Sequence, residues 1–374
     1  MIRMSEMVLP GHPDKFCDQV ADAIIAHTVE IDPDAYGQIE VATWSDQVWL
    51  SGGVCTSAPL VKSMADIVVE TGKRLGYRDG NWIDAAKYQV NSTVCQLIDD
   101  PRKWSHKVND QAIVVGWAGY DAKTAYLSPE HFLAHTFREA LSLSCSSGTL
   151  KGQGPDGKLL VVMSEDARGW RLESLLVTLQ QLESKSFVEL TDEIESVVAA
   201  TYAKLQAVDD RWTSEWRHIT LRINPNGPLT NGGSDGDNGQ TGRKLAMDYY
   251  GPRVPQGGGA LCGKHLTHID RIGSYTARQA AVHAVKTGAK ECLIKLAYAP
   301  NLMDPMEVSW EVDGRCEKVP LSFFNFEEMR SRFSATAINQ SLAQGRHFFD
   351  TALPWNGAVA TTAAIERETL KFAA

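Results

Sequence analysis

The most informative part of this chain is the stretch Gly232-Gly233-Ser234-Asp235-Gly236-Asp237-Asn238-Gly239-Gln240-Thr241-Gly242-Arg243-Lys244. A second glycine-rich loop follows it, Gln256-Gly257-Gly258-Gly259-Ala260-Leu261-Cys262-Gly263-Lys264. Glycine lets the backbone approach a ligand closely, and successive N–H groups in such turns bind anions. The closing Arg and Lys side chains add the charge that phosphate oxygens need. Although the GxxxxGK[ST] spacing of a P-loop is absent, the two loops favour a polyphosphate site over flexible surface loops.

The composition is that of a globular protein with a sizeable core. Of the 374 residues, 43% are hydrophobic and 22% are charged, which is typical of soluble domains. The net charge of −9 excludes a broad basic face, so no nucleic-acid partner is expected. The seven cysteines lack CxxC spacing, which favours reduced thiols over disulfides or zinc. Because no signal peptide or membrane-spanning run is present, we expect a cytoplasmic protein without a membrane partner.

Hydrophobic periodicity predicts an α+β chain with alternating helices and strands. Helices are expected at residues 14–31, 60–75 and 274–287, with two more within 172–206. Strands are expected at residues 39–43, 47–54, 159–163, 218–223, 292–297 and 308–312. These elements divide into three similar units of ordinary domain size, at residues 1–104, 105–228 and 229–374. The polar segment 97–110 has no periodicity and is either a mobile loop over a site or a simple connection.

The segment Gly11-His12-Pro13-Asp14-Lys15 precedes the first predicted helix. Proline restricts His12 to an extended conformation and places the next residues at a helix N-terminus, where anions are favoured. A triphosphate bound by His12 and Lys15, with Asp14 on a Mg²⁺ ion, would be chemically consistent. Taken alone, the pattern is better explained by an aspartate that caps a helix.

Taken together, the motifs resemble the methionine adenosyltransferase (S-adenosylmethionine synthetase) family. They follow the family's order and spacing along essentially the whole chain, as Ser5-Glu6, Gly11 to Lys15, Asp156-Gly157-Lys158, Asn224 to Lys244, Gly257 to Lys264, and Asp270-Arg271. The resemblance implies an α+β fold of three similar α/β-repeat domains in a pseudo-threefold arrangement. It also implies a homodimer or homotetramer in which two inverted subunits share each active site.

The resemblance further implies the family's reaction, in which the adenosyl group of ATP moves to the sulfur of L-methionine. Triphosphate leaves and is hydrolysed to phosphate and diphosphate. In-line attack at C5′ needs little acid–base chemistry, so the protein must position the reactants and stabilise the leaving group. The positions that match the family's catalytic residues are His12, Lys158, Arg243 and Lys264. Those that match its nucleotide contacts are His12, Lys15, Asp156, Asp237, Arg243, Lys244, Ala260 and Lys264.

The matching positions for the acceptor are Val54, Asp110, Asp237 and His268, and two Mg²⁺ ions would be held by Asp14 and Asp270. Two of these acceptor positions depart from the family pattern. Val54 stands where the family has a glutamate, and that glutamate resembles a counter-ion for the methionine ammonium. His268 stands where the family has a lysine, and that lysine resembles a partner for the methionine carboxylate.

Other departures concern the loop, the base and the monovalent cation. The loop from Asp99 to Lys107 is shorter than the family's mobile loop. Pro228-Leu229 replaces an Arg-Phe pair whose ring lies on the adenine, so the base preference of the nucleotide is open. The carboxylate that helps to hold K⁺ in the family falls near Glu40 or Val41, which puts K⁺ dependence in doubt.

The departures leave three interpretations, because losing one charge partner of a zwitterionic substrate typically costs ~2–5 kcal/mol. Compensated drift would keep methionine as the acceptor, with Asp46, His106 or Lys107 taking over the lost roles. A divergent relative would keep displacement at C5′ of ATP or a related nucleotide but use another small-molecule acceptor or an internal nucleophile. The third interpretation is a silent nucleotide-binding regulatory subunit, and the retained metal carboxylates disfavour it.

Overall fold

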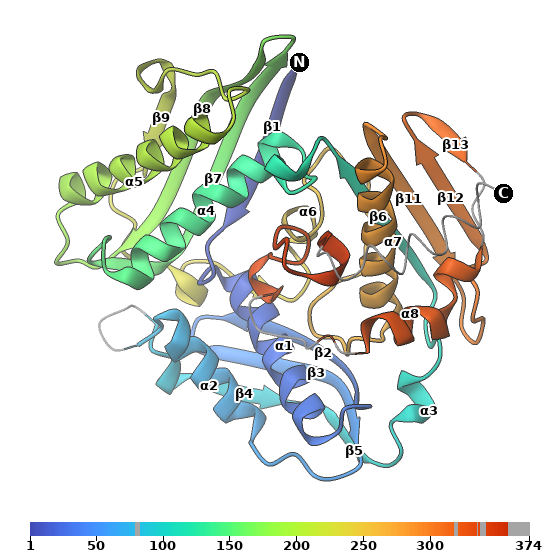
Figure 1. Cartoon of the computed structure of the whole chain (residues 1–374). Helices are drawn as coiled ribbons and strands as arrows, with labels where there is room; N and C mark the ends of the chain where they lie inside the picture. The colour runs from blue at the N-terminus through green and yellow to red at the C-terminus, as the bar shows by residue number, and fades with distance from the viewer. Residues whose placement is uncertain (79–82, 318–320, 335, 337–341, 358–374) are drawn as a thin grey trace.

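The computed structural model describes residues 1–78, 83–317, 321–334, 336 and 342–357. Within these residues the strands form three sheets, and helices pack against each of them (Figure 1). Each sheet contributes to its own cluster of buried apolar side chains. The predicted α+β fold is therefore confirmed.

The first sheet has the strand order β10-β2-β3-β4, with β5 paired to β3. Its strands are β2 Tyr36–Trp44, β3 Gln47–Thr56, β4 Gln89–Ser92, β5 Cys95–Ile98 and β10 Gly239–Gln240. Helices α1 Pro13–Ile31 and α2 Met64–Leu75 pack against this sheet. Because side chains alternate along a strand, Val48 and Leu50 lie in the core beneath the helices while Trp49 is exposed.

The second and third sheets are each covered by a long helix. The second has the order β1-β7-β8-β9, with strands β1 Ile2–Val8, β7 Gln153–Asp166, β8 Gly169–Gln181 and β9 Thr220–Ile223. Helix α4 Pro129–Ser147 packs on it and on α5 Phe187–Val208. The third has the order β13-β12-β11-β6, with strands β6 Ala112–Gly119, β11 Glu291–Tyr298, β12 Glu307–Val312 and β13 Arg315–Glu317.

Helix α7 Ile269–Lys286 packs on β6 and β11, and α8 Phe326–Phe333 packs on α7. The approach of α7 to β6 is close because Gly116 has no side chain, and a Cβ there would collide with the Ala277 backbone. Two further helices are single turns, α3 Arg102–Ser105 and α6 Leu245–Asp248.

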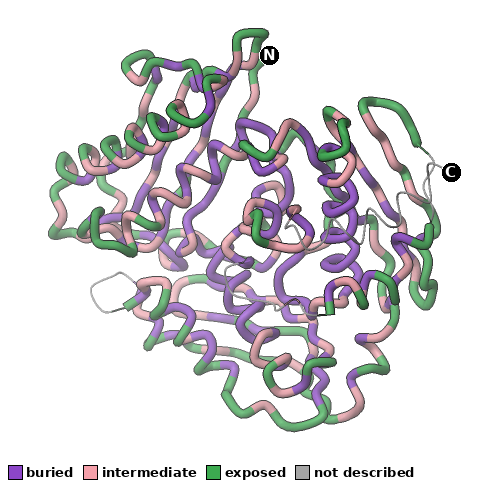
Figure 2. The backbone as a smooth tube through the Cα atoms, viewed as in Figure 1, coloured by how far each residue is buried: buried purple, intermediate pink, exposed green. Residues whose placement is uncertain are grey.

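Each sheet combines strands from distant parts of the chain. N-terminal β1 pairs with β7, β6 pairs with β11, and β10 pairs with β2. The sheets therefore cross the spans 1–104, 105–228 and 229–374, and these domain bounds stay a prediction. Helices α1 and α7 are buried along most of their length, and the buried segments gather near the centre of the molecule (Figure 2).

Most of the predicted elements are present, with one clear error. The structure describes all of residues 172–206, and the one helix in that range is α5 rather than the two predicted. The first part belongs to strand β8, where Leu175, Val177 and Leu179 are buried in alternation. That period of two is the strand signal, and it outweighs the helix propensity of leucine. The segment 97–110 contains α3, and the Ser105 hydroxyl donates to the Asp34 carbonyl at 2.7 Å.

Candidate active site

His12 caps the N-terminus of α1. Its backbone is extended, as the following proline requires, and its Nδ1 accepts a hydrogen bond from the Asp14 N–H at 3.1 Å. The side chain is fully buried, and burial lowers its pKa to about 3. The imidazole is therefore neutral, and because Nδ1 accepts, Nε2 carries the proton. Within the described residues Nε2 has no hydrogen-bond partner, and it lies 3.9 Å from the Asp237 carboxylate.

Four side chains from the first glycine-rich loop and from β7 surround this cap. The Asp14 carboxylate accepts from Lys244 Nζ, and Arg243 lies 3.7 Å from the same carboxylate. Lys158 Nζ lies 3.3 Å from the Asp237 carboxylate. The side chains of Lys158 and Arg243 are 53% and 44% exposed, so both cations are accessible to a ligand from solvent. Half-exposed cations beside a helix N-terminus form an anion site.

The N-terminus of α7 has a similar arrangement. His268 Nδ1 accepts from the Asp270 N–H at 3.2 Å, and the Asp270 carboxylate pairs with Lys264 Nζ at 2.6 Å. Burial lowers the pKa of His268 well below its usual value, so this imidazole is neutral too. The two glycine-rich loops meet here, because a Cβ at Gly242 would lie 2.9 Å from that of Ala260.

A stripe of three aspartates on α1 holds both glycine-rich loops. Asp14 accepts from the Gln240 N–H, Asp18 from Gly242 and Asp22 from Gly263, at 2.9, 2.9 and 2.8 Å. Asp22 also forms a two-pronged ion pair with Arg271 of α7, with both distances 2.9 Å. Asp18 and Asp22 belong to none of the motifs in the sequence that predict the site. Their spacing from Asp14, four residues at each step along a predicted helix, is the signal that could have found them.

Lys15, a predicted nucleotide ligand, does not lie with the exposed cations. It is fully buried, and its Nζ lies 2.7 Å from the Asp18 carboxylate and 2.6 Å from that of Asp248. Burial raises the pKa of Asp18 to about 7, against the opposing effect of Lys15. The predicted contact between Lys15 and phosphate stays a prediction, and this ion pair would have to break for it to form.

Three more predicted residues do not belong to the group of exposed cations. Val54 is 2% exposed and lies in the core beneath α1, on the face of β3 that also carries Val48 and Leu50. Asp156 is buried, accepts from the Gly233 N–H at 2.9 Å, and has a pKa that burial raises to about 6. Asp110 is exposed, and its carboxylate accepts from the next backbone N–H at 2.8 Å.

The positions predicted for K⁺ and for the adenine differ in exposure. Val41 is 1% exposed and lies in the core, whereas Glu40 is half-buried on the other face of β2. Burial raises the pKa of Glu40, and the charge of Lys264 opposes that rise. The carboxylate in this region that a cation can reach is therefore Glu40. Pro228 is exposed, and the backbone of Leu229 pairs with Gln180 at the edge of the second sheet.

Asp14 and Asp270 have the chemistry that Mg²⁺ requires. Each carboxylate lies at a helix N-terminus and pairs with a lysine, Lys244 or Lys264, that phosphate oxygens can attract instead. The freed carboxylate oxygens are hard ligands, and Mg²⁺ is commonly held by one or two carboxylates together with substrate phosphates. Among the described residues, the one group of three potential ligands lies elsewhere, at Asp18, Asp248 and Cys262, and Lys15 already binds its two carboxylates.

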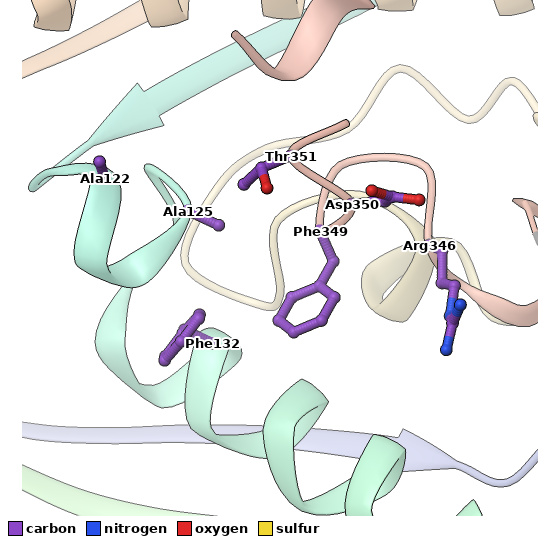
Figure 3. Close-up of a pocket in the computed structure, with 7 residues that line it drawn as sticks. All are labelled: Ala122, Ala125, Phe132, Arg346, Phe349, Asp350 and Thr351. Carbon is purple, nitrogen blue, oxygen red and sulfur yellow. The ribbon is translucent and has the colours of Figure 1, made fainter. Parts of the chain in front are cut away.

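A hollow of about 360 Å³ lies away from these residues, between the start of α4 and the C-terminal segment (Figure 3). It is lined by Ala122, Ala125, Phe132, Arg346, Phe349, Asp350 and Thr351. In the close-up, the Phe349 ring lies between Phe132 and Arg346. None of the described residues predicted for the site lines this hollow, so it is not part of the anion site.

Comparisons with known proteins agree with the resemblance. A model described as the S-adenosylmethionine synthetase N-terminal domain matches residues 1–97, and the C-terminal domain model matches residues 231–359. An S-adenosylmethionine synthase from Acholeplasma laidlawii is 34% identical over 320 residues, which are 81% of this chain and 80% of that protein. This chain belongs to the S-adenosylmethionine synthetase family.

Other relatives of the family support the same assignment. An S-adenosylmethionine synthase from Rhodospirillum centenum is 32% identical over 318 residues, 83% of this chain and 80% of that protein. A solved structure described as an unusual S-adenosylmethionine synthetase from Campylobacter jejuni has a TM-score of 0.84. It covers 98% of this chain and 99% of its own and is 22% identical, so it shows that the fold is shared.

Membership of the S-adenosylmethionine synthetase family confirms the prediction of a transferase that binds nucleotide and metal. Within the part of the chain that the structure describes, no helix has both the length and the apolar character needed to cross a membrane.

Proposed function

We propose that this chain catalyses ATP-dependent adenosyl transfer to L-methionine and releases phosphate and diphosphate. The observation that carries the proposal is the assembly of cations around the α1 cap. Lys158, Arg243 and Lys244 come from two separate segments, and all of them lie near the unpaired His12 Nε2–H. A triphosphate leaving group needs this combination of charge and a directed hydrogen-bond donor.

His12 would donate from Nε2 to the oxygen that bridges C5′ and the triphosphate. Because Nδ1 is occupied by the Asp14 N–H, the proton is held at Nε2 before the substrate arrives. Lys158 and Arg243 would balance the charge that develops on the leaving phosphates, and Lys264 would extend this function toward α7. Held on a rigid helix cap, the donor needs little reorganisation when the C5′–O bond breaks.

Asp14 and Asp270 would hold two Mg²⁺ ions together with the phosphates. When bound, the ions would neutralise phosphate charge. Phosphate oxygens would take over Lys244 and Lys264, which now pair with these two aspartates. We make no proposal for K⁺ beyond naming Glu40 as the carboxylate that is placed to bind it.

Of the four acceptor positions, the two that depart from the family pattern offer no charge to methionine. Val54 is enclosed in the core, and His268 is a neutral cap. These observations favour a second candidate, the same displacement at C5′ with a different acceptor or an internal nucleophile. His268→Lys should then lower KM for methionine. Val54→Glu is less suited to this test, because it would bury an unpaired carboxylate.

We further propose a homodimer or homotetramer with shared active sites. The exposed face of the first sheet supports it. Two large apolar side chains lie there on neighbouring strands, Trp44 on β2 and Trp49 on β3. They are 50% and 43% exposed, and neighbouring exposed apolar groups mark association surfaces. Sedimentation velocity of the purified chain tests the oligomeric state directly.

The reaction is tested by incubating the purified protein with ATP and Mg²⁺, with and without methionine, and separating the products by mass-coupled chromatography. The proposal expects S-adenosylmethionine, phosphate and diphosphate in equal amounts, only when methionine is present. If triphosphate or its hydrolysis products form without methionine, the result favours the second candidate, displacement at C5′ with a different acceptor or an internal nucleophile. Nucleotide binding without any turnover would contradict both and favour a regulatory subunit.

A further inference from the structure

A groove of about 510 Å³ lies behind the loop that carries His12. Its walls come from three parts of the chain, the C-terminal end of α2, the C-terminal half of α4 and the segment around Arg346. Its floor is formed by Pro10-Gly11 and by Gly154-Pro155. None of the described residues assigned to the anion site lines it, so the groove is a separate feature.

The groove is strongly cationic in a chain with a net charge of −9. Lys73, Arg74, Arg78 and Arg346 line it. Among the described lining residues the one carboxylate is Glu139, and it already pairs with Arg346 and with the buried Arg138. Cationic side chains therefore outnumber carboxylates in the described lining, and Glu70, whose charge acts on Arg74, lies on α2 outside it. A ligand carrying a dianion would be attracted there.

Apolar side chains form the rest of the lining. Leu9, Leu75, Leu143 and Leu182 contact the same space as the cations. A groove of this volume is within the range of small-molecule sites, which combine an apolar wall with a few charged groups that orient the ligand. The lining therefore matches an organic anion better than a bare inorganic ion.

The floor of the groove is in direct contact with the candidate active site. Gly11 packs against Pro155 so closely that a Cβ there would collide with the Pro155 carbonyl, and Tyr77 donates a hydrogen bond to the Gly11 carbonyl. Gly11 is followed by His12, and Pro155 is followed by Asp156. A ligand in the groove would press on the two loops that position these side chains.

We propose that this groove binds a small phosphate monoester with an apolar ring or chain, and that its occupancy changes turnover at the His12 site. The phosphate dianion contacts Lys73 and Arg74, and the apolar part lies against Leu75 and Leu143. Because the ligand bridges α2 and α4, it fixes the first sheet, against which α1 and its cap His12 pack, relative to the second sheet, which carries Lys158 on β7. This regulatory site goes beyond the proposed reaction and does not depend on which acceptor is used.

Isothermal titration with phenyl phosphate tests the binding without requiring activity. We expect one saturable site in the wild type and binding weaker by about tenfold or more in the double variant K73E/R74E, which reverses two charge-assisted contacts. The matched control K204E/R222E makes the same charge change at exposed positions on α5 and β9 and should bind as the wild type does. Inorganic phosphate should bind more weakly, because it lacks the apolar part.

A second arm distinguishes the groove from the anion site. R243A/K264A should retain phenyl phosphate binding, and K73E/R74E should keep its basal ATP turnover while losing the response to the ligand. The proposal is overturned if R243A/K264A abolishes binding and K73E/R74E does not. It is also overturned if inorganic phosphate binds as tightly as phenyl phosphate, or if turnover of the wild type is unchanged at saturation.

Discussion

The N-termini of α1 and α7 are built alike, yet only the α1 cap has half-exposed cations beside it. Each has a histidine cap and, two residues later, an aspartate paired with a lysine. Around the α1 cap, the side chains of Lys158 and Arg243 are 53% and 44% exposed. Around the α7 cap, the side chain of Lys264 is 8% exposed and is bound to Asp270.

The difference shows that a local motif fixes the cap but not the charge that a ligand meets. His12 and His268 follow from short sequences with the same spacing, whereas the exposed cations near His12 come from β7 and the first glycine-rich loop. An anion can reach the exposed Lys158 and Arg243 beside α1 without displacing a buried ion pair. At the α7 end it must first displace the Lys264–Asp270 pair. We therefore infer that the triphosphate engages α1 first.

Asp14→Asn and Asp270→Asn test whether the two ends act as equal halves of a metal site. Each change removes an anionic oxygen ligand while keeping the side-chain size, and Mg²⁺ prefers anionic oxygen. Both variants should lose activity at low millimolar Mg²⁺ and recover part of it at higher concentrations. Activity measured against Mg²⁺ checks this, and an unchanged dependence in both variants would remove the two-metal assignment.

Asp22→Asn tests the ion pair that joins α1 to α7. Asp22 and Arg271 are both fully buried, and removing one partner of a buried pair costs about 3–5 kcal/mol. The free energy of unfolding, measured in urea, should fall by that amount. The exposed Asp210→Asn is the control and should change stability by less than about 0.5 kcal/mol. Equal effects of the two changes would show that the pair does not hold the helices together.

Lys158→Ala sharpens the comparison, because Lys158 lies beside the α1 cap and has no counterpart among the residues described at α7. Turnover should fall by ~10²–10³ because the variant loses a cation directed at the leaving group. Nucleotide affinity should change much less. Lys204→Ala is the control and should turn over as the wild type does. If Lys158→Ala also turns over at nearly the wild-type rate, the leaving group is stabilised by other residues.

The smallest expected effect is the pH dependence of stability, and it has the same sign for His12 and His268. The pKa of His12 falls from 6.5 to about 3 on folding because the side chain is buried. The unfolded chain therefore binds a proton below pH 6.5 that the folded chain does not, so the stability is complete above pH 6.5 and declines toward pH 3. As the pH falls from 6 to 4, this protonation lowers the free energy of unfolding of the wild type by about 1.4 kcal/mol per pH unit. The variant His12→Asn should not show that decrease.

His268→Asn should behave in the same way, because burial also lowers the pKa of His268. Urea unfolding of the wild type and both variants at a series of pH values measures the effect. A difference between wild type and variant that stays constant from pH 7 to 4 would show that these histidines are protonated in the folded state.

The sequence predicts the parts of the site that depend on local spacing. The extended His12 before a proline, the helix that follows it and the glycine-rich loops with basic ends all belong to short segments. Their residues share one site because α1 carries aspartates at every fourth position that bind the loop N–H groups. A count of acidic residues on the predicted helix face would have found that stripe.

The parts that the sequence does not predict depend on distant partners. Lys15 is removed from the exposed cations by Asp248, which is 233 positions away along the chain. The burial of Val54 follows from its place on the same face of β3 as Val48 and Leu50, a two-residue alternation that the motif comparison did not use. The range 172–206 holds part of strand β8 where a helix is predicted, and the buried alternation of Leu175, Val177 and Leu179 is again the strand signal.

The most direct test of the account is a steady-state comparison of His12→Asn with His268→Asn, with kcat and the KM of the acceptor measured separately. Asparagine preserves the helix cap in both variants, so the comparison isolates what each imidazole does beyond capping. The account predicts that His12→Asn lowers kcat by ~10²–10³ because Nε2 is lost as a donor to the leaving group, while the acceptor KM stays within a few-fold of the wild type. It predicts that His268→Asn leaves kcat within a few-fold of the wild-type value, because the His268 imidazole is a neutral cap and makes no assigned contact with the leaving group. If both variants lower kcat to the same extent, His12 is not the donor to the leaving group.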